Sequence, residues 1–203
     1  MTSYGTSGRS YLLRAQRELA TGEPDRLFYA AFELRAGIEA RLQEYLECQE
    51  HVPDGRKRDW QTARLGASVS QAFGVDKVAR VKIRDQRAGV TRHTFFYTPV
   101  TAELQQLGKR LGDYLHTVPY RPAENEWWSS FRTAVEIGCH LLEDATEGTL
   151  LGPPLLNKKT GHLHLPMTLP AGLTAADVGS RGDNVVLDVR YFETLADARG
   201  DPA

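Results

Sequence analysis

The stretch PDRLFYAAFELRAGIEARLQEYLECQ, residues 24–49, decides the first part of the fold. Its apolar side chains recur every three or four residues, which places them on one stripe of an α-helix. That stripe consists of Leu27, Ala31, Leu34, Ile38, Leu42 and Tyr45. A shorter amphipathic segment, residues 9–21, precedes it across a link so short that we expect an antiparallel helical hairpin over residues 9–50. Because the first helix is too short to cover the stripe, the second must also pack on the body of the domain or on a second subunit.

The periodicity of the chain changes after residue 77. Three apolar residues then alternate with three basic ones, which is the two-residue period of a β-strand. The alternating residues are Ala79, Arg80, Val81, Lys82, Ile83 and Arg84. A second apolar run, residues 94–97, follows a turn that contains Gly89. The pattern predicts an antiparallel β-hairpin over residues 77–98.

The rest of the chain continues this mixture of helices and strands. Residues 99–146 have the spacing of two helices, the first with Pro99 at its first position. Within residues 161–194 we expect two strands, 162–169 and 184–193, and we expect the final ADARGDPA to form a loose tail. The order predicts an α+β fold: an N-terminal antiparallel helical hairpin, further helices, and antiparallel β-hairpins forming a small sheet. A length of 203 residues fits a single domain spanning residues 1–203.

Composition narrows the class of protein. Hydrophobic residues make up 41% and charged residues 25% of the chain, as in an ordinary globular domain. The sequence shows neither a signal peptide nor an apolar run of membrane-spanning length, so we expect a cytoplasmic protein with no membrane partner. Cys48 and Cys139 are far apart and are expected to be reduced thiols. The sequence contains no nucleotide-binding or metalloprotease motif, and no cofactor is expected.

The formal net charge of −1 conceals a strong asymmetry along the chain. Residues 56–93 contain ten basic side chains and three acidic ones, so that segment is strongly positive and the remainder is negative. A distribution of this kind indicates one surface built for an anionic partner.

The predicted hairpin carries most of this positive charge. Residues two apart on a strand share a face, so Arg80, Lys82 and Arg84 are expected to form a row that Arg87 extends into the turn. Like charges in one row repel each other unless a polyanion or the protein's own carboxylates compensate them. The candidate nucleic-acid-binding residues are Lys77, Arg80, Lys82, Arg84, Arg87 and Arg92. Two other interpretations remain open: a solvated face that protects an edge strand from aggregation, or pairing with acidic residues of the helical hairpin within the chain or across a dimer.

The stretch FYAAFELRAGIEARLQEYL, following a short first helix, resembles the paired helices of HEPN domains. These are small helical domains of bacterial toxin and defence systems, often dimeric and often ribonucleases. The resemblance covers about residues 10–48 and implies self-association through the helical pair. Ribonuclease members carry an arginine followed four to six residues later by a histidine, on a helix at a dimer cleft. Arg87 and His93 satisfy that count on the predicted hairpin, whereas Arg132 and His140 share a helix at a longer spacing.

Two further pairs of residues could carry chemistry. Arg35 and Glu39 lie four residues apart on the apolar stripe, which indicates a partly buried ion pair that sets helix packing, or a site where Arg35 holds an anion. His162 and His164 share one strand face and could bind a transition metal if a third ligand, Asp188 or Glu193, converged on them.

We therefore expect a non-enzymatic accessory protein that binds DNA or RNA through the basic hairpin and forms a homodimer through the helical hairpin. One alternative is an HEPN-like, metal-independent ribonuclease that uses Arg87 with His93 or Arg132 with His140. Another is a protein-interaction subunit whose basic surface docks an acidic partner.

Overall fold

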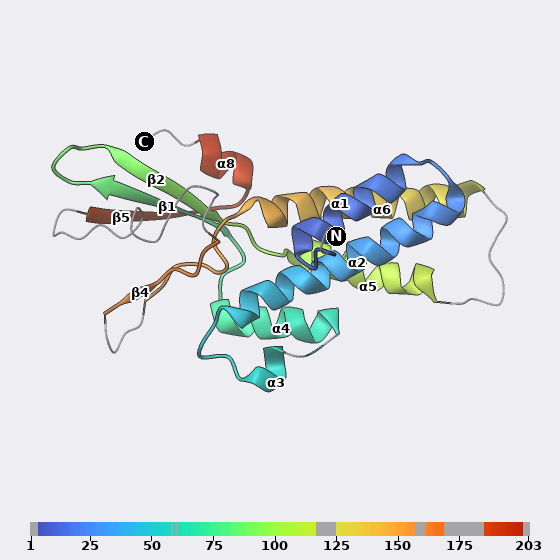
Figure 1. Cartoon of the computed structure of the whole chain (residues 1–203), viewed down its shortest axis with the longest axis horizontal. Helices are drawn as coiled ribbons and strands as arrows, with labels where there is room; N and C mark the ends of the chain where they lie inside the picture. The colour runs from blue at the N-terminus through green and yellow to red at the C-terminus, as the bar shows by residue number, and fades with distance from the viewer. Residues whose placement is uncertain are drawn as a thin grey trace. The chain divides into compact units, whose positions relative to one another are not determined.

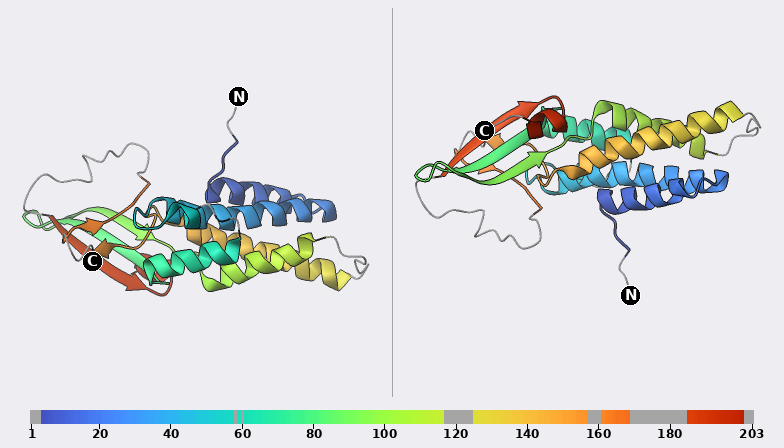
Figure 2. Two further views of the ribbon diagram at one scale, coloured as in Figure 1. Left: turned by 90° about the horizontal axis from the view of Figure 1, so that it is seen from below. Right: turned by 90° about the horizontal axis from the view of Figure 1, so that it is seen from above.

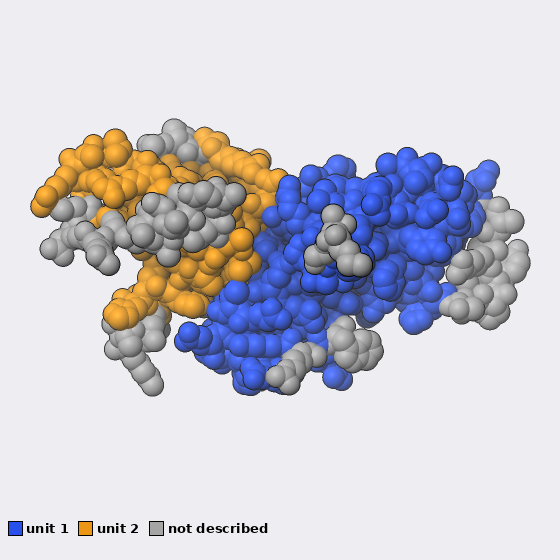
Figure 3. Space-filling view, in the orientation of Figure 1, with its two compact units in different colours: residues 1–72, 100–146 blue, residues 73–99, 147–203 orange. Residues whose placement is uncertain are grey.

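The computed structural model describes residues 4–57, 59, 61–116, 125–156, 161–168 and 185–200. The chain divides into two compact units, shown in different colours in Figure 3. Unit 1 comprises residues 1–72 and 100–146, and unit 2 comprises residues 73–99 and 147–203. The α+β fold class is confirmed, whereas a single domain spanning residues 1–203 stays a prediction.

Unit 1 is helical. Its longer helices pack along one another, and shorter helices follow the end of the second helix (Figures 1 and 2). The helices are α1 (Gly8–Ala20), α2 (Pro24–Glu47), α3 (Asp54–Lys57), α4 (Thr62–Phe73), α5 (Ala102–Leu115) and α6 (Asn125–Glu147). The predicted helical hairpin is confirmed by α1 and α2, with Ser7 capping α1 and Pro24 opening α2.

The apolar stripe of α2 is covered within unit 1. A Cβ atom added at Gly37 would lie 2.7 Å from Leu142 of α6 and 3.0 Å from Tyr11 of α1. A Cβ atom added at Gly138 of α6 would lie 2.6 Å from the side chains of Leu34 and Leu107, so α2, α5 and α6 approach closely there. The apolar stripe of α2 therefore packs on other helices of the same chain, as one of the two predicted alternatives required. Self-association through the helical hairpin stays a prediction.

A buried arginine ties three helices of unit 1 together. Arg41 of α2 is only 5% exposed, and its Nε donates to the carbonyl of Ala145 on α6 at 2.9 Å. Its Nη1 donates to Glu44 at 2.8 Å, and the other oxygen of that carboxylate accepts from the backbone N–H of Gly8 on α1 at 2.8 Å. A buried charge is costly unless it is paired and hydrogen-bonded, and here both conditions are met.

Unit 2 is built on a three-stranded antiparallel sheet with the order β2-β1-β5 (Figures 1 and 2). Its strands are β1 (Val78–Asp85), β2 (Thr91–Tyr97) and β5 (Val185–Phe192). The predicted hairpin is confirmed, and Gly89 in its turn has a φ of 67°, a conformation that favours glycine. A separate two-stranded ribbon pairs β3 (Leu155–Leu156) with β4 (Leu163–His164).

Three of the predicted elements differ markedly from the structure. The helix expected from Pro99 begins at Ala102, because the hydroxyl of Thr101 accepts the backbone N–H of Leu104 at 3.2 Å and so caps the helix there. The strand expected over residues 162–169 is reduced to Leu163–His164, with residue 169 outside the described residues.

The third difference is the expected loose tail, whose residues 196–200 belong to the short helix α8 (Leu195–Gly200), while residues 201–203 lie outside the described residues. Thr194 caps it by accepting the backbone N–H of Asp197 at 3.1 Å. Leu195 and Ala198 are buried against Val78 of β1, so apolar burial on the sheet holds this helix in place.

No helix in the described part of the chain is long and apolar enough to cross a membrane. Both cysteines are free thiols, as expected. Burial, together with the nearby Glu143 and Glu136, raises the pKa of Cys139 to about 12. Burial also raises the pKa of Cys48, which is only partly enclosed.

We expect iodoacetamide at pH 8 to modify Cys48 in the folded protein and to modify Cys139 only after unfolding in urea. A thiol with a pKa of about 12 is thiolate in only about one molecule in ten thousand at pH 8. Mass spectrometry of the alkylated peptides measures both rates, with Cys139→Ser as the control. Equal rates for the two cysteines in the folded protein would contradict this expectation.

Candidate nucleic-acid interface

One face of the sheet gathers polar and cationic side chains from β1, β2 and β5. Lys82 lies opposite Thr94 of β2 and Asp188 of β5, and the next residue on the same face of β1 is Arg84. We call this surface the polar sheet face. Its members are Lys82, Arg84, Thr94, Val186, Asp188 and Arg190. The opposite face is apolar and buried on β1 and β2, where Val81, Ile83, Phe95 and Tyr97 are at most 4% exposed.

Arg80 does not belong to the exposed row that the sequence predicted. Its side chain is only 3% exposed, its Nη1 donates to the carbonyl of Ala198 at 2.9 Å, and its guanidinium lies 4.9 Å from the centre of the Phe192 ring. Helix α8, which was expected to be a loose tail, packs at the start of β1 and withdraws this arginine from solvent. Arg80 is therefore a structural residue and is removed from the candidate binding set.

We expect Arg80→Met to destabilise the packing of α8 by about 1–3 kcal/mol, because the substitution removes a buried charge-assisted hydrogen bond and keeps the aliphatic stem. Arg84→Met, on the half-buried end of the same strand, should change stability by less than about 0.5 kcal/mol. Hydrogen exchange of the α8 amides, followed by mass spectrometry, measures the difference. Equal protection of α8 in the two variants would refute the structural role of Arg80.

Two other candidates are neutralised by carboxylates of their own unit. Lys77 bonds to Glu193 just beyond β5, and Arg92 bonds to Asp85 at the end of β1. The basic residues nearer the start of the positive segment belong to unit 1, where Arg64 pairs with Asp59 at 3.7 Å. Arg58 lies outside the described residues. The positive segment thus does not form one surface of one unit.

Three cations of the hairpin have no carboxylate partner among the described residues. Within the part of the chain that the structure describes, no carboxylate lies within ion-pair distance of Lys82, Arg84 or Arg87. Lys82 faces Asp188 in the sheet, but the ion pair of Asp188 is with Arg190, at 3.4 Å. Lys82 and Arg84 are half-buried and Arg87 is exposed in the turn, so their charged groups can reach solvent.

Asp85 organises the turn that presents Arg87. Its Oδ1 accepts the backbone N–H groups of Arg87 at 2.9 Å and Ala88 at 3.0 Å, and its Oδ2 accepts from Arg92. The hydrogen bond from Ala88 and the interaction with Arg92 lower the pKa of this carboxyl. A lowered pKa in the folded state means that the carboxylate stabilises the turn above its unfolded pKa and that this contribution is lost as the pH falls.

We therefore expect the turn to loosen in acid, as the pH falls below about 4. Asp85→Asn should weaken the turn at neutral pH and remove most of this acid dependence, because an amide can accept the two N–H groups but carries no charge. Amide exchange of residues 87–89, measured by NMR over a pH series, tests both effects.

Asp76→Asn is the control for this experiment. Asp76 precedes β1, at the opposite end of the strand from the turn, so its replacement should leave the turn unchanged. The interpretation fails if Asp85→Asn retains the acid dependence of the unmodified protein.

The candidate ribonuclease residues lie in different settings. Arg87 is in the turn and His93 is on β2, stacked on Phe95 with ring centres 6.0 Å apart. Arg132 of α6 donates to the carbonyl of Gly22 at 3.0 Å, in the link between α1 and α2. His140 is exposed on α6. The Arg132 guanidinium thus has a structural partner, and the ribonuclease alternative stays a prediction.

The histidine pair is placed on the short ribbon. His164 is in β4 opposite Leu155, and His162 precedes this strand. The suggested third ligand, Asp188, is bonded to Arg190, and Glu193 is bonded to Lys77. Among the described residues, no group of three or more histidine, cysteine, aspartate or glutamate side chains could hold a metal ion.

The predicted pair of Arg35 and Glu39 forms at 3.2 Å. Glu39 also accepts a hydrogen bond from the hydroxyl of Thr62, the first residue of α4, at 2.8 Å. Arg35 packs against Gly112 of α5, where a Cβ atom would lie 3.0 Å from its Nη1. These contacts join α2, α4 and α5 and favour the structural interpretation of the pair.

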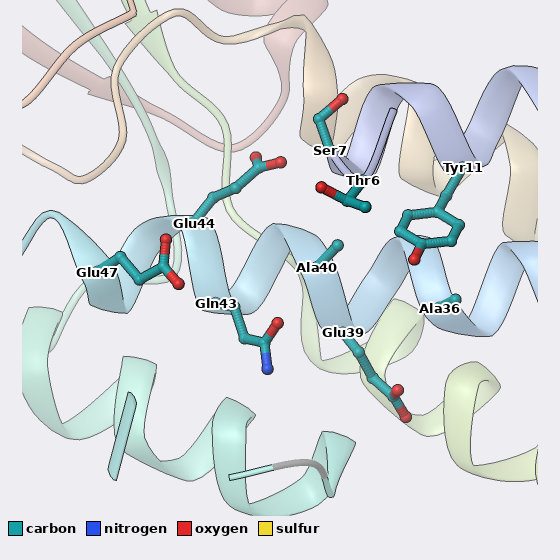
Figure 4. A pocket seen from close by; sticks show the side chains of 9 residues that line it. All are labelled: Thr6, Ser7, Tyr11, Ala36, Glu39, Ala40, Gln43, Glu44 and Glu47. Carbon is teal, nitrogen blue, oxygen red and sulfur yellow. The ribbon is translucent and has the colours of Figure 1, made fainter. Parts of the chain in front are cut away.

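A cavity of about 460 Å³ lies along α2 beside the start of α1 (Figure 4). Its lining is rich in carboxylates and small residues. The lining residues are Thr6, Ser7, Tyr11, Ala36, Glu39, Ala40, Gln43, Glu44 and Glu47. Glu39 and Glu44 are already bonded to Arg35 and Arg41, respectively. The cavity therefore offers few uncommitted groups for a ligand.

Comparison with protein-family models, with curated proteins and with solved structures found no match to this chain. The resemblance to HEPN domains stays a prediction.

Sequence reasoning missed the contribution of β5 to the polar sheet face. Asp188 and Arg190 alternate with Leu187, Val189 and Tyr191, and this alternation was a visible signal for a strand with one polar face. What the sequence did not contain was the pairing of this strand with β1, which places Asp188 opposite Lys82 and Arg190 opposite Arg80. Such pairing is a long-range interaction that local periodicity cannot reveal.

Proposed function

We propose that the protein is a non-enzymatic accessory protein that binds DNA or RNA through the polar sheet face and the neighbouring turn. The observation that carries the proposal is that Lys82, Arg84 and Arg87 have no carboxylate partner among the described residues, although they follow one another along one hairpin. Arg190 lies on the same face and is paired with Asp188 at 3.4 Å.

Phosphate groups would compensate this charge. Each lysine or arginine that binds a phosphate displaces condensed counterions, which supplies sequence-independent affinity that weakens steeply with salt. The face offers cations and the hydroxyl of Thr94, whereas Phe95 is buried on the other face and Phe96 packs against the cluster of Val78, Leu195 and Ala198. This chemistry fits binding to the sugar-phosphate backbone better than stacking on bases, so binding should depend little on sequence.

The test is to replace two residues together, Lys82→Glu with Arg84→Glu. Binding of a short fluorescent duplex DNA and of a single-stranded RNA is measured by anisotropy between about 50 and 200 mM salt. We expect at least about tenfold weaker binding. The slope of the logarithm of affinity against the logarithm of salt concentration should become shallower by about two, because two side chains no longer bind phosphate.

A matched control places the same charge change elsewhere. Lys109→Glu with Arg110→Glu, on the exposed side of α5 in unit 1, alters the net charge by the same amount. This control should bind as the unmodified protein does. If both double variants weaken binding equally, the effect is one of net charge and the assignment of the polar sheet face is wrong. Absence of any complex with DNA or RNA at low salt would refute nucleic-acid binding altogether.

The same surface could dock an acidic protein, and the titrations separate the two possibilities. A nucleic-acid interface gives a salt-dependent complex with both DNA and RNA that the Lys82 and Arg84 double variant loses. Gel analysis of the RNA after each titration addresses the ribonuclease alternative, because cleavage that disappears on His93→Ala or His140→Ala would replace the non-enzymatic assignment.

A further inference from the structure

Strand β5 is an edge of the three-stranded sheet, and it exposes apolar side chains on both of its faces. Val186, Leu187 and Tyr191 are 39%, 38% and 45% exposed, respectively. The strand pairs with β1 over eight consecutive residues without a register shift, and it contains neither proline nor glycine. Regular edge strands with apolar side chains are templates for pairing with another strand.

The other edge strand, β2, is less suited to such pairing. The carbonyl of Phe96 on β2 already accepts the backbone N–H of Leu150 at 3.0 Å. The pairing of β2 with β1 also contains an irregularity next to Ile83. Interrupted edges of this kind resist the addition of a strand, so β5 is the edge on which a partner strand fits.

The sequence of β5 is chemically symmetric about Val189. Leu187 and Tyr191 flank this residue at two positions, and Asp188 and Arg190 flank it at one. If two copies of β5 pair antiparallel about a two-fold axis at Val189, Asp188 of each copy lies opposite Arg190 of the other. Leu187 of each copy then lies opposite Tyr191 of the other, on the opposite face of the sheet.

Only this register places the opposite charges of Asp188 and Arg190 across from each other. A two-fold axis perpendicular to a continuous antiparallel sheet does not exchange the two faces of the sheet. Residues paired across the axis must therefore point to the same face, so the axis passes through a residue that pairs with the same residue of the other copy. An axis at Asp188 would place two aspartates opposite each other, and an axis at Arg190 would place two arginines opposite each other. Directly opposed like charges are destabilising, whereas the Val189 register gives two pairs of opposite charge.

The pairing of β5 with β1 adds a reason for this arrangement. Arg80 and Arg190 lie opposite each other in the sheet, and Arg190 is paired with Asp188 of its own strand at 3.4 Å. In the symmetric register, Asp188 of the second copy lies on the other side of Arg190 and adds a second carboxylate beside it. The row across the four central strands then alternates between basic and acidic residues except where Arg80 faces Arg190.

We propose that β5 pairs with β5 of a second copy of this chain in the Val189 register, forming a six-stranded antiparallel sheet across a symmetric dimer. Because the interface is the same patch on both copies, it closes at two chains and does not propagate into fibres. The proposal does not depend on nucleic-acid binding, although the dimer would place two polar sheet faces side by side.

The test uses two complementary single variants of the full chain, Asp188→Arg and Arg190→Asp. Each variant paired with itself places two like-charged pairs across the axis, so each should be monomeric in sedimentation equilibrium where the unmodified protein is a dimer. An equimolar mixture of the two variants restores opposite charge at both positions and should form a heterodimer. Different affinity tags on the two variants allow the heterodimer to be isolated.

Restored pairing in the mixture shows that each variant is folded, and circular dichroism of each variant provides a second check. Arg110→Asp, an exposed change on α5, should leave the dimer intact. The proposal is overturned if the unmodified protein is monomeric throughout the concentration series, if either single variant dimerises as the unmodified protein does, or if the folded variants do not associate when mixed.

Discussion

The hydrogen bond from Arg80 to the carbonyl of Ala198 joins α8 to the first half of β1 and buries this arginine there. Helix α8 packs its buried side chains on Val78 and beside Phe192, and it covers the one basic residue that lies at that end of the strand. Burying a guanidinium is costly, and the Ala198 carbonyl and the Phe192 ring offset part of that cost. Beyond α8, the same alternation along β1 continues with Lys82 and Arg84, which are half-buried and have no ion-pair partner among the described residues.

The polar sheet face therefore contains the cations of the hairpin for which the described residues supply no carboxylate, together with the ion pair of Asp188 and Arg190. Carboxylates of unit 2 neutralise Lys77 and Arg92 at the two ends of the hairpin, and α8 withdraws Arg80. What is left is a compact group of cations between these points. A modest group of this kind suits binding to a polyanion along its backbone, since each ion pair contributes additively and requires little shape complementarity.

The sequence predicted the elements well where periodicity was sustained over many residues. The stripe of α2 and the alternation of β1 are both of this kind, and the structure has a helix and a strand at those positions. Prediction failed where the deciding signal was short or distant. Thr194 and Asp197 cap a helix of only six residues, whose stability depends on burial against β1 and not on local propensity.

The candidate site was likewise predictable where it depended on local periodicity and not where it depended on distant contacts. Which residues share a face of β1 could be derived from the two-residue period, whereas the burial of Arg80 required knowledge of a segment more than a hundred residues away. The contribution of Asp188 and Arg190 likewise required the register of β5 against β1. The buried hydrogen bonds of Arg41 were missed for a related reason, because its position on α2 gave no indication that the carbonyl of Ala145 lies beside it.

The interleaving of the two units along the chain has a consequence for synthesis. The β1–β2 hairpin leaves the ribosome before α5 and α6, which complete unit 1, and long before β5 and α8, which complete its own sheet. At translation rates of about 5–20 residues per second, the nascent hairpin waits for seconds with Arg80 and the apolar face of β1 uncovered. Chaperones that hold exposed strands would have their main opportunity to act on this protein during that interval.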